Sequence, residues 1–391
     1  MLARGPLCQR TTQYDAPMAD VPFTTLRDRI DAVDRKIIGL LAERLEIVEH
    51  VAAAKLANAS PFRDREREEQ LVLRLRSHAT AAGLDPHHIE GLYRIIMDMS
   101  VAHQEAIVRR RTDAPLRIAY QGVEGSYSHL AAQLRYAGRE GGALLAGHES
   151  FRSAANTVLD GSADVALLPI ENTTAGSINE TYDLLAGGAL HITGEVVRAI
   201  EHCLLALPGV AVEQLRTVIS HPQALAQCHD FFMRHPHLTA RPEFDTAGAA
   251  QRVRDGSDPS FGAIASAAAA TRYGLTVLAT GIQSAAGNST RFVEVSLRPA
   301  PIAEGEEVKT SLVFVLAERP GALSEVLSHF ARRNLSLTKI ESRPIPAAPF
   351  TYRFYADVLG HAASAAFIAA LHGLRDLTTE LHVLGTYPVA A

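Results

Sequence analysis

The spacing of apolar residues changes along the chain, and this change limits the folds that the chain can adopt. Over residues 24–55 apolar side chains recur at steps of three and four, the period of one face of a long amphipathic helix. Two more helical stretches are predicted at residues 67–82 and 86–109. Beyond residue 115, short strand-like runs alternate with helical ones, which is typical of an α/β domain.

The length of 391 residues exceeds what one hydrophobic core usually organises, so we expect a multidomain chain. We predict an N-terminal extension at 1–22, an all-α domain at 23–111 and an α/β domain at 115–298. The last region, 308–388, follows the order βαββαβ of an α+β ferredoxin-like module.

Charge and cysteine content exclude several classes of protein. The net charge is −5 and the basic run 109–111 stands alone, so no nucleic-acid partner is expected. Three cysteines without a CxxC pair, and no HExxH among 17 histidines, predict neither a disulfide framework nor a metal site. No signal-peptide core or membrane-length apolar run is seen, so we expect a cytoplasmic protein that starts at Met1 or Met18.

Two cations lie where the first helix should present an apolar stripe. Arg44 and Lys55 are eleven residues apart, about three helical turns, so both project from nearly one face, roughly 16 Å apart. A cation beside apolar surface is costly unless an anion meets it. Protein carboxylates, a bound anionic ligand, or two side chains that extend into water remain alternatives at this point.

The polar positions of this helical region resemble those of the all-helical chorismate mutase family. They are Leu26-Arg27-x-x-Ile30-Asp31-x-x-Asp34, Leu41-Ala42-Glu43-Arg44, Lys55, Arg63-Asp64-x-x-Arg67-Glu68 and Asp98-x-Ser100-x-x-x-Gln104. The resemblance implies a chorismate site formed by Arg27, Arg44, Lys55, Asp64, Arg67, Glu68, Ser100 and Gln104. Within it, Lys55 and Gln104 would be the catalytic donors to the ether oxygen. A concerted [3,3] rearrangement needs positioning and such donors, and no cofactor.

The helix geometry adds a hypothesis about assembly. Arg27 and Arg44 are seventeen residues apart, about 25 Å along one helix and roughly 100° apart around it. One small substrate cannot contact both in the same chain. We therefore expect Arg27 to enter the site from a second protomer, in a homodimer or higher homo-oligomer.

Four polar clusters follow in the α/β region. They are Gly125-Ser126-Tyr127-Ser128-His129 after a predicted strand, Pro169-Ile-Glu171-Asn172-Thr-Thr-Ala-Gly176-Ser177, Ser220-His221-Pro222-Gln223 and Asn288-Ser289-Thr290-Arg291-Phe292. The first is a strand-to-helix turn that suits a carboxylate, and it lacks the GxGxxG pattern of a dinucleotide site. In this order the clusters resemble prephenate dehydratase over residues 116–297. The resemblance implies two lobes similar to type II periplasmic binding proteins, with the site in the cleft between them.

The same resemblance assigns roles to single residues of that cleft. Thr290 would donate to the departing hydroxyl, with Arg291 as an electrostatic partner. Substrate contacts would come from Ser126, Asn172 and Ser177. For His221 a helix cap and a catalytic role both stay open, as does the role of Glu171.

The last 80 residues resemble the phenylalanine-responsive ACT domain. The resemblance rests on Pro320-Gly321-Ala322-Leu323 and Glu341-Ser342-Arg343-Pro344. It implies a phenylalanine site across a dimer interface formed by Gly321, Ala322, Leu323, Asn334, Glu341, Ser342 and Arg343. A ferredoxin-like module that only dimerises is the alternative.

Together, the three resemblances predict a bifunctional enzyme of phenylalanine biosynthesis that rearranges chorismate to prephenate. It would then decarboxylate and dehydrate prephenate to phenylpyruvate, under feedback inhibition by phenylalanine and without a cofactor. A binding protein would carry a secretion signal, a transcription regulator a basic recognition helix, and a dehydrogenase a glycine fingerprint. An inactive relative stays open, although suitable residues fill both predicted sites.

Overall fold

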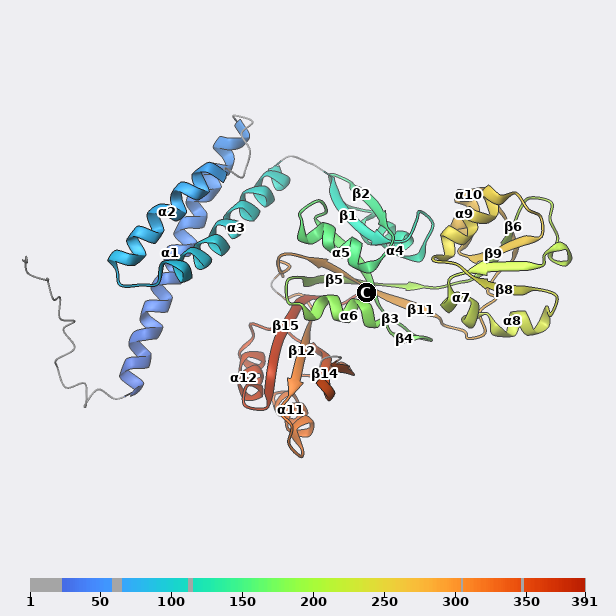
Figure 1. The fold of residues 1–391 in the computed structure, drawn as a ribbon. Coiled ribbons are helices and arrows are strands. Elements are labelled where there is room, and N and C mark those ends of the chain that lie inside the picture. Colours follow the sequence, from blue (N-terminus) through green and yellow to red (C-terminus); the bar gives the residue numbers. More distant parts are fainter. Residues whose placement is uncertain (1–22, 58–64, 112–114, 304, 346–347, 391) are drawn as a thin grey trace, which may run out of the picture. The chain divides into compact units, whose positions relative to one another are not determined.

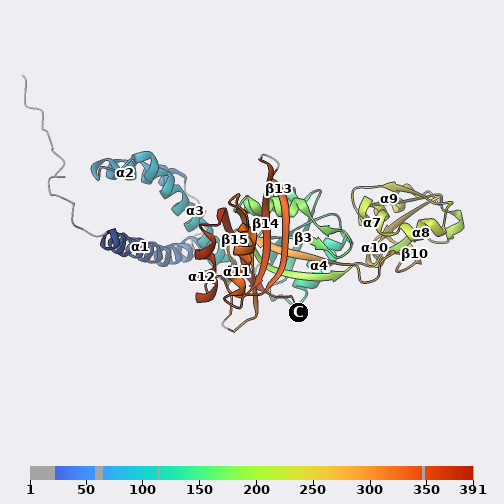
Figure 2. The same ribbon diagram turned by 90° about the horizontal axis from the view of Figure 1, so that it is seen from below.

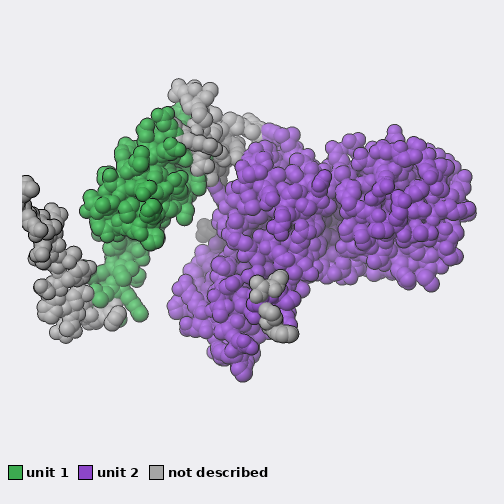
Figure 3. Space-filling model, in the orientation of Figure 1, with its two compact units in different colours: residues 1–114 green, residues 115–391 purple. Residues whose placement is uncertain are grey.

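The structure, a computed structural model, describes residues 23–57, 65–111, 115–303, 305–345 and 348–390. The chain divides into two compact units, residues 1–114 and 115–391 (Figure 3). Each unit is described by itself below. The predicted extension at 1–22 lies outside the described residues.

The first unit consists of three helices, as the sequence predicts. They are α1 (Phe23–Ala57), α2 (Arg65–Ala81) and α3 (Pro86–Arg111). Both α1 and α2 pack on α3. Among the described side chains of these helices, the buried apolar ones are Val48, Ala52, Val72, Ala79 and Met97. By contrast, Ile38 on α1 is 66% exposed and Ile95 on α3 is 68% exposed, so these helices leave much apolar surface uncovered.

The second unit begins with a lobe built on a mixed sheet (Figure 1). Its strands are β1 (Leu116–Gln121), β2 (Ala143–His148), β3 (Val165–Asn172), β4 (Gly176–Ser177), β5 (His191–Ala199) and β11 (Ser289–Ser296). Its helices are α4 (Tyr127–Tyr136), α5 (Phe151–Leu159) and α6 (Asn179–Ala186). The strand order is β2-β1-β3-β11-β5, with β4 beside β3. The late strand β11 runs antiparallel to both of its neighbours.

The second lobe is inserted between β5 and β11. Its strands are β6 (Cys203–Ala206), β7 (Thr217–Ser220), β8 (Thr239–Pro242), β9 (Phe261–Ala265) and β10 (Thr276–Ala279), in the order β10-β6-β9-β7-β8. Its helices are α7 (Pro222–Gln227), α8 (His229–Arg234), α9 (Thr246–Gly256) and α10 (Ala267–Tyr273), with the 3₁₀ turn η2 (Val212–Gln214). The predicted two-lobed α/β architecture is confirmed. Because the chain crosses between lobes after β5 and before β11, the start of β11 lies at the crossover.

The C-terminal region of this unit has the predicted ferredoxin-like order. It consists of β12 (Val308–Leu316), α11 (Ala322–Ala331), β13 (Leu337–Ile345), β14 (Ala348–Leu359), α12 (Ala365–Leu374) and β15 (Thr378–Pro388). The antiparallel sheet has the order β13-β14-β12-β15. Both helices cover one face of it (Figure 2), where Phe314, Phe330 and Phe367 share a core.

The opposite face of this small sheet packs on the first lobe. Side chains alternate along a strand, so Leu312 and Phe314 face the helices while Val313 faces the lobe. Val313 joins Val293 of β11 in one hydrophobic core. At the closest approach, a Cβ atom added to Gly385 of β15 would overlap the backbone carbonyl of Ile192 on β5. The module and the lobe therefore fold as one body with a shared core.

Candidate active sites

Six of the eight residues predicted for the helical site line one cavity of about 250 Å³ in the first unit. They are Arg44, Lys55, Arg67, Glu68, Ser100 and Gln104, and they come from all three helices. Apolar side chains such as Val48 and Met97 close the cavity between them. The arrangement places three cations and one carboxylate around a small space, which suits a dianionic ligand.

The polar groups of this cavity are partly arranged by each other. Arg44 donates a hydrogen bond to the Ser100 hydroxyl, which donates to the Ile96 carbonyl at 2.7 Å. The buried Gln104 amide donates to the Ser100 carbonyl at 3.4 Å. Its Oε1 atom has no hydrogen-bond partner among the described residues. Because an unpaired buried amide oxygen is costly, this atom indicates a position for a ligand or water.

Of the other two residues predicted for this site, only Arg27 is among the described residues. Arg27 is exposed near the start of α1 and does not line the cavity. Because α1 is continuous from Phe23 to Ala57, the seventeen-residue separation from Arg44 is a real distance of about 25 Å along the axis. Asp64 lies outside the described residues.

A second cavity, of about 310 Å³, lies between the two lobes of the second unit. Ser126, Asn172 and Thr290 line it, as the sequence predicts. Ser177 and Arg291 do not. Arg291 follows Thr290 on β11, and because successive side chains of a strand point to opposite faces, only Thr290 faces this cavity. Ser177 accepts a hydrogen bond from Lys339 of β13 at 3.1 Å.

The hydroxyl of Thr290 is buried and oriented by one neighbour. The residue is 7% exposed, and the Asn172 amide donates to its Oγ1 atom at 2.9 Å. The Asn172 carbonyl oxygen in turn accepts from the side chains of Thr174 and Gln227. Since Oγ1 already accepts one hydrogen bond, its own proton is available for a group in the cavity.

No lysine or arginine is found among the described residues that line this cavity. The first turns of α4 and α9 line it instead. Ser126 caps α4 by accepting from the His129 amide, and Asp245 is the N-cap of α9. Free backbone N–H groups and the helix dipole favour an anion at such ends. His221 also lines the cavity, and its ring caps α7 by accepting from the Gln223 amide at 3.2 Å.

Several cavity residues escaped the sequence analysis, among them His202, Gln227 and Asp245. Burial lowers the pKa of His202 and raises the pKa of Asp245, although the Val123 amide donates to the Asp245 carboxylate. For Asp245 and Gln227 the sequence contained a pattern that could have indicated them. Asp245 precedes Thr246 at a helix start, and Gln227 lies one turn after Gln223. His202 carried no pattern that sequence reasoning could have used.

A third cavity, of about 470 Å³, lies at the start of α11. Of the predicted effector residues, Gly321, Ala322 and Leu323 line it. The remaining four, Asn334, Glu341, Ser342 and Arg343, do not. Arg343 points to the first lobe, where it donates to the Asp183 carboxylate at 2.9 Å. Within one chain the two predicted effector segments are therefore not brought together.

The cysteines of the second unit carry no reactive chemistry. Cys203 and Cys228 are free and fully buried, and burial raises the pKa of Cys228 to about 12. A thiol with such a pKa is not a nucleophile at neutral pH. Cys8 lies outside the described residues. Among the helices that the structure describes, none is long and apolar enough to cross a membrane.

The fold and cavities define a multidomain enzyme with an attached regulatory module. Chorismate mutase type II matches residues 26–105, prephenate dehydratase matches 118–300 and the ACT domain matches 310–376. A bifunctional chorismate mutase/prephenate dehydratase of Enterobacter agglomerans is 38% identical over 94% of this chain and 96% of the relative. The chain therefore belongs to the bifunctional chorismate mutase/prephenate dehydratase family.

Other relatives cover about 70% of this chain. Arogenate dehydratase 2 of Petunia hybrida is 44% identical over 70% of this chain and 72% of its own length. The solved structure of prephenate dehydratase from Arthrobacter aurescens in complex with L-Phe is 31% identical. It superposes with a TM-score of 0.63 and covers 70% of this chain and 90% of that one.

Proposed function

We propose that the first unit rearranges chorismate to prephenate and that the interlobe cavity converts prephenate to phenylpyruvate, with phenylalanine as feedback inhibitor. The three functional regions would span residues 23–111, 115–298 and 308–388. The observation that carries the proposal is the convergence of Arg44, Lys55 and Gln104 on one cavity, because these residues lie far apart in sequence. A cytoplasmic location is part of the proposal and is supported by the two free buried thiols.

In the mutase cavity, Arg44 binds a carboxylate of chorismate, with Arg67 in support. Lys55 and Gln104 donate to the ether oxygen, where negative charge develops as the C–O bond breaks and the new C–C bond forms. Glu68 accepts from the ring hydroxyl, and Asp64 is proposed to do the same. Ser100 holds the guanidinium of Arg44 in place. No proton or electron leaves the substrate, so positioning and electrostatics suffice.

In this proposal, the residue that binds the second carboxylate of chorismate comes from another protomer. Arg27 is too far along α1 to share the cavity with Arg44 of its own chain. The exposed apolar residues Ile30, Val33, Ile37 and Ile38 follow Arg27 on α1 and would be covered by a partner helix. Partner and substrate together would complete the site of an intertwined homodimer.

In the interlobe cavity, Thr290 donates its proton to the departing ring hydroxyl. The C–O bond breaks while the bond to the ring carboxylate supplies the electron pair, so water and carbon dioxide leave, the ring becomes aromatic, and solvent returns a proton to the Thr290 oxygen. The hydroxyl of Ser126 and the amide of Asn172 contact the substrate or hydrogen-bond to residues that contact it. A carboxylate is bound by the first turn of α4, since arginine and lysine are missing from the described lining and the first turn of α9 already faces the buried Asp245 carboxylate.

A second candidate substrate for this cavity is arogenate, which carries an amino group where prephenate has a keto group. Glu180 and Asp245 line the cavity, and a carboxylate there suits an ammonium group. The identity to a protein named arogenate dehydratase 2 supports the same candidate. Parallel assays with both substrates distinguish them.

We further propose that the ACT domain binds phenylalanine at the cavity beside Gly321, Ala322 and Leu323. The 31% identical relative solved in complex with L-Phe supports this proposal. Asn334, Glu341, Ser342 and Arg343 would then reach the effector from a second protomer. Isothermal titration calorimetry with phenylalanine tests the sensor, and a folded chain that releases no heat of binding contradicts it.

Incubating the purified chain with chorismate tests the whole proposal. We expect chorismate to disappear, prephenate to rise and then fall, and phenylpyruvate to accumulate. Phenylalanine should slow the last step. A folded chain that leaves chorismate unchanged contradicts the first activity, and one that stops at prephenate contradicts the second.

A further inference from the structure

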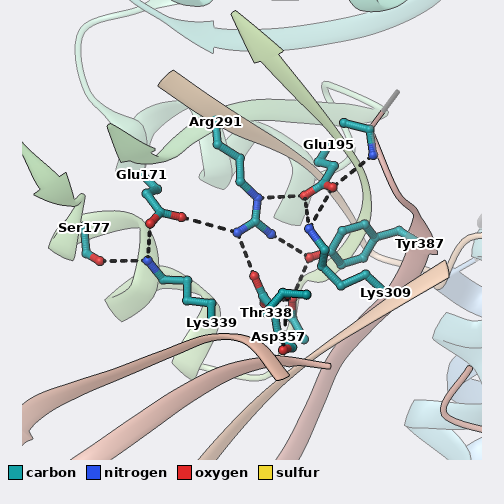
Figure 4. Close-up of polar contacts among 11 residues, drawn as sticks. Glu171, Ser177, Glu195, Arg291, Lys309, Thr338, Lys339, Asp357 and Tyr387 are labelled. Carbon is teal, nitrogen blue, oxygen red and sulfur yellow. Dashed lines mark hydrogen bonds and ion pairs between the residues drawn. The ribbon is translucent and has the colours of Figure 1, made fainter. Parts of the chain in front are cut away.

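The side of β11 that faces away from the interlobe cavity carries a buried guanidinium with three close acceptors (Figure 4). The side chain of Arg291 is only 12% exposed. It donates to Glu195 of β5 at 2.7 Å, to Asp357 of β14 at 2.7 Å and to the Tyr387 hydroxyl of β15 at 2.9 Å. Two of these three acceptors belong to the ACT domain.

These acceptors are themselves fixed by further contacts. Lys309 of β12 donates to both oxygens of Glu195, at 2.9 and 3.1 Å. Ser311 donates to Asp357 at 2.5 Å and lies 2.6 Å from the Tyr387 hydroxyl. Burial alone would raise the pKa of Glu195, but the cations beside it hold the pKa below its usual value. The cluster is thus a charged, hydrogen-bonded network that orients the guanidinium from several sides.

The charges of this network balance only when both domains are present. The dehydratase lobe contributes Arg291, Glu195 and Glu171, and the ACT domain contributes Lys309, Lys339 and Asp357. The first set carries one excess negative charge and the second one excess positive charge. Without the ACT domain, Arg291 would keep its pair with Glu195 but lose Asp357 and Tyr387, and Glu195 would lose Lys309, so the guanidinium would be held from one side only.

Arg291 directly follows Thr290 in the chain, and the two side chains leave the strand in opposite directions. Thr290 lies at the crossover between the lobes, where β11 has just begun. The register between β11 and β3 shifts directly after Arg291, so regular pairing on that side is interrupted at this point. Pairing with β5 is regular from Ser289 to Glu294, so one strand pair already holds the start of β11, and the anchored guanidinium adds a second constraint beside the interrupted pairing with β3.

We propose that Arg291 is a positioning residue of the dehydratase site, and that Asp357 and Tyr387 of the ACT domain hold it so that Thr290 faces the substrate. The ACT domain then forms part of the dehydratase machinery even without effector. This inference rests on the proposed function of Thr290. A network that only joins the domains would lower the folded fraction and leave the turnover of folded protein unchanged, whereas displacing a catalytic hydroxyl lowers kcat.

The test uses the full chain, without phenylalanine, and the variant Asp357→Asn. This change removes one charge and keeps an oxygen that can accept from Ser311. We expect dehydratase kcat to fall about tenfold to a hundredfold with KM changed less than about threefold, because the defect lies in geometry at the reacting hydroxyl. Mutase turnover in the same chain should stay unchanged.

A matched control is Asp183→Asn, which also removes a carboxylate from an ion pair between the lobe and the ACT domain. Asp183 pairs with Arg343, and no contact between it and β11 is found among the described residues. We expect this control to retain dehydratase kcat within about twofold. Near-ultraviolet circular dichroism and thermal unfolding establish that both variants are folded.

Graded variants keep the inference testable if Asp357→Asn unfolds. Tyr387→Phe removes one acceptor and should reduce kcat severalfold, and Arg291→Lys should lose less activity than Arg291→Met. The inference is overturned if folded Asp357→Asn and Tyr387→Phe both match Asp183→Asn. Thr290→Ala separates the two levels of proposal. If it is inactive while Asp357→Asn is normal, only the positioning role fails, and if it stays active, the role of Thr290 fails first.

Discussion

The two enzymatic cavities of this chain offer an anion quite different surroundings. The mutase cavity presents the charged side chains of Arg44, Lys55 and Arg67. The interlobe cavity shows no lysine or arginine among its described lining residues and presents hydroxyls, amides and helix starts instead. Both would receive a dicarboxylate under the proposed function.

The difference follows from where each cavity lies on its helices. Arg44, Ser100 and Gln104 of the mutase cavity lie inside long helices, where backbone N–H groups are already paired, whereas Lys55 lies in the last turn of α1 and Arg67 in the first turn of α2. Most of the positive charge of this cavity comes from side chains. The interlobe cavity lies where helices begin, and the first turn of α4 offers N–H groups there without a lysine or arginine in the described lining. The fold thus determines which chemical means of binding an anion is available.

The largest effect is expected at the Thr290 hydroxyl, where one substitution should remove the dehydratase activity and spare the mutase activity. Thr290→Ala should lower phenylpyruvate formation by about a thousandfold or more, because it removes the proton donor and its hydrogen bond with Asn172. Mutase turnover should be unaltered. Both rates can be followed in one preparation, and dehydratase activity near the wild-type level would contradict the assignment.

The reciprocal experiment changes the mutase cavity. Lys55→Met keeps the length of the side chain and removes its charge, so chorismate consumption should fall by about a hundredfold to a thousandfold. Dehydratase activity with added prephenate should not change. Equal losses of both activities would mean that the variant is misfolded or that the two units depend on one another.

Mixing two inactive chains tests whether the mutase cavity needs a residue from a second protomer. Arg27→Ala and Arg44→Ala should each lose mutase activity alone. In mixed dimers one of two sites would contain both native arginines, so random exchange should restore about a quarter of the wild-type rate. Proven subunit exchange without any recovery would contradict the intertwined dimer.

The smallest effect concerns salt. Raising the ionic strength from about 0.05 to 0.5 M should increase the mutase KM severalfold, because its partly exposed cations are screened. The dehydratase KM should change by less than about twofold, since short hydrogen bonds to backbone donors are screened less. Steady-state kinetics of both reactions over a salt series would measure the contrast. If both KM values change equally with salt, the prediction is contradicted.

Local patterns predicted much of this molecule. The three-and-four spacing placed all three helices of the first unit within a few residues of their observed ends, because one face of each is apolar. The βαββαβ order of the last region was also predicted. The six mutase residues that meet in one cavity were expected from the resemblance to the chorismate mutase family, whereas helical spacing alone related only Arg44 and Lys55.

Non-local pairing explains what the sequence could not predict. The position of β11 between β3 and β5 depends on a strand that returns after an entire lobe, and no local pattern encodes that return. Hence Thr290 could be recognised by its motif, whereas the direction of Arg291 could not. The contacts of Ser177 with Lys339 and of Arg343 with Asp183 likewise join segments about 160 residues apart.

The absence of a side chain at Gly385 has a consequence for building chimaeras from this chain. The strand that carries it runs against the backbone of Ile192 with no space for even a methyl group. A regulatory module transplanted from another enzyme would need glycine at the matching place. A larger residue would keep the module away from the first lobe, and the charged groups that pair between the two would separate. The ACT domain therefore cannot be exchanged freely for that of another enzyme. Only a glycine at position 385 leaves room for it to pack on the lobe.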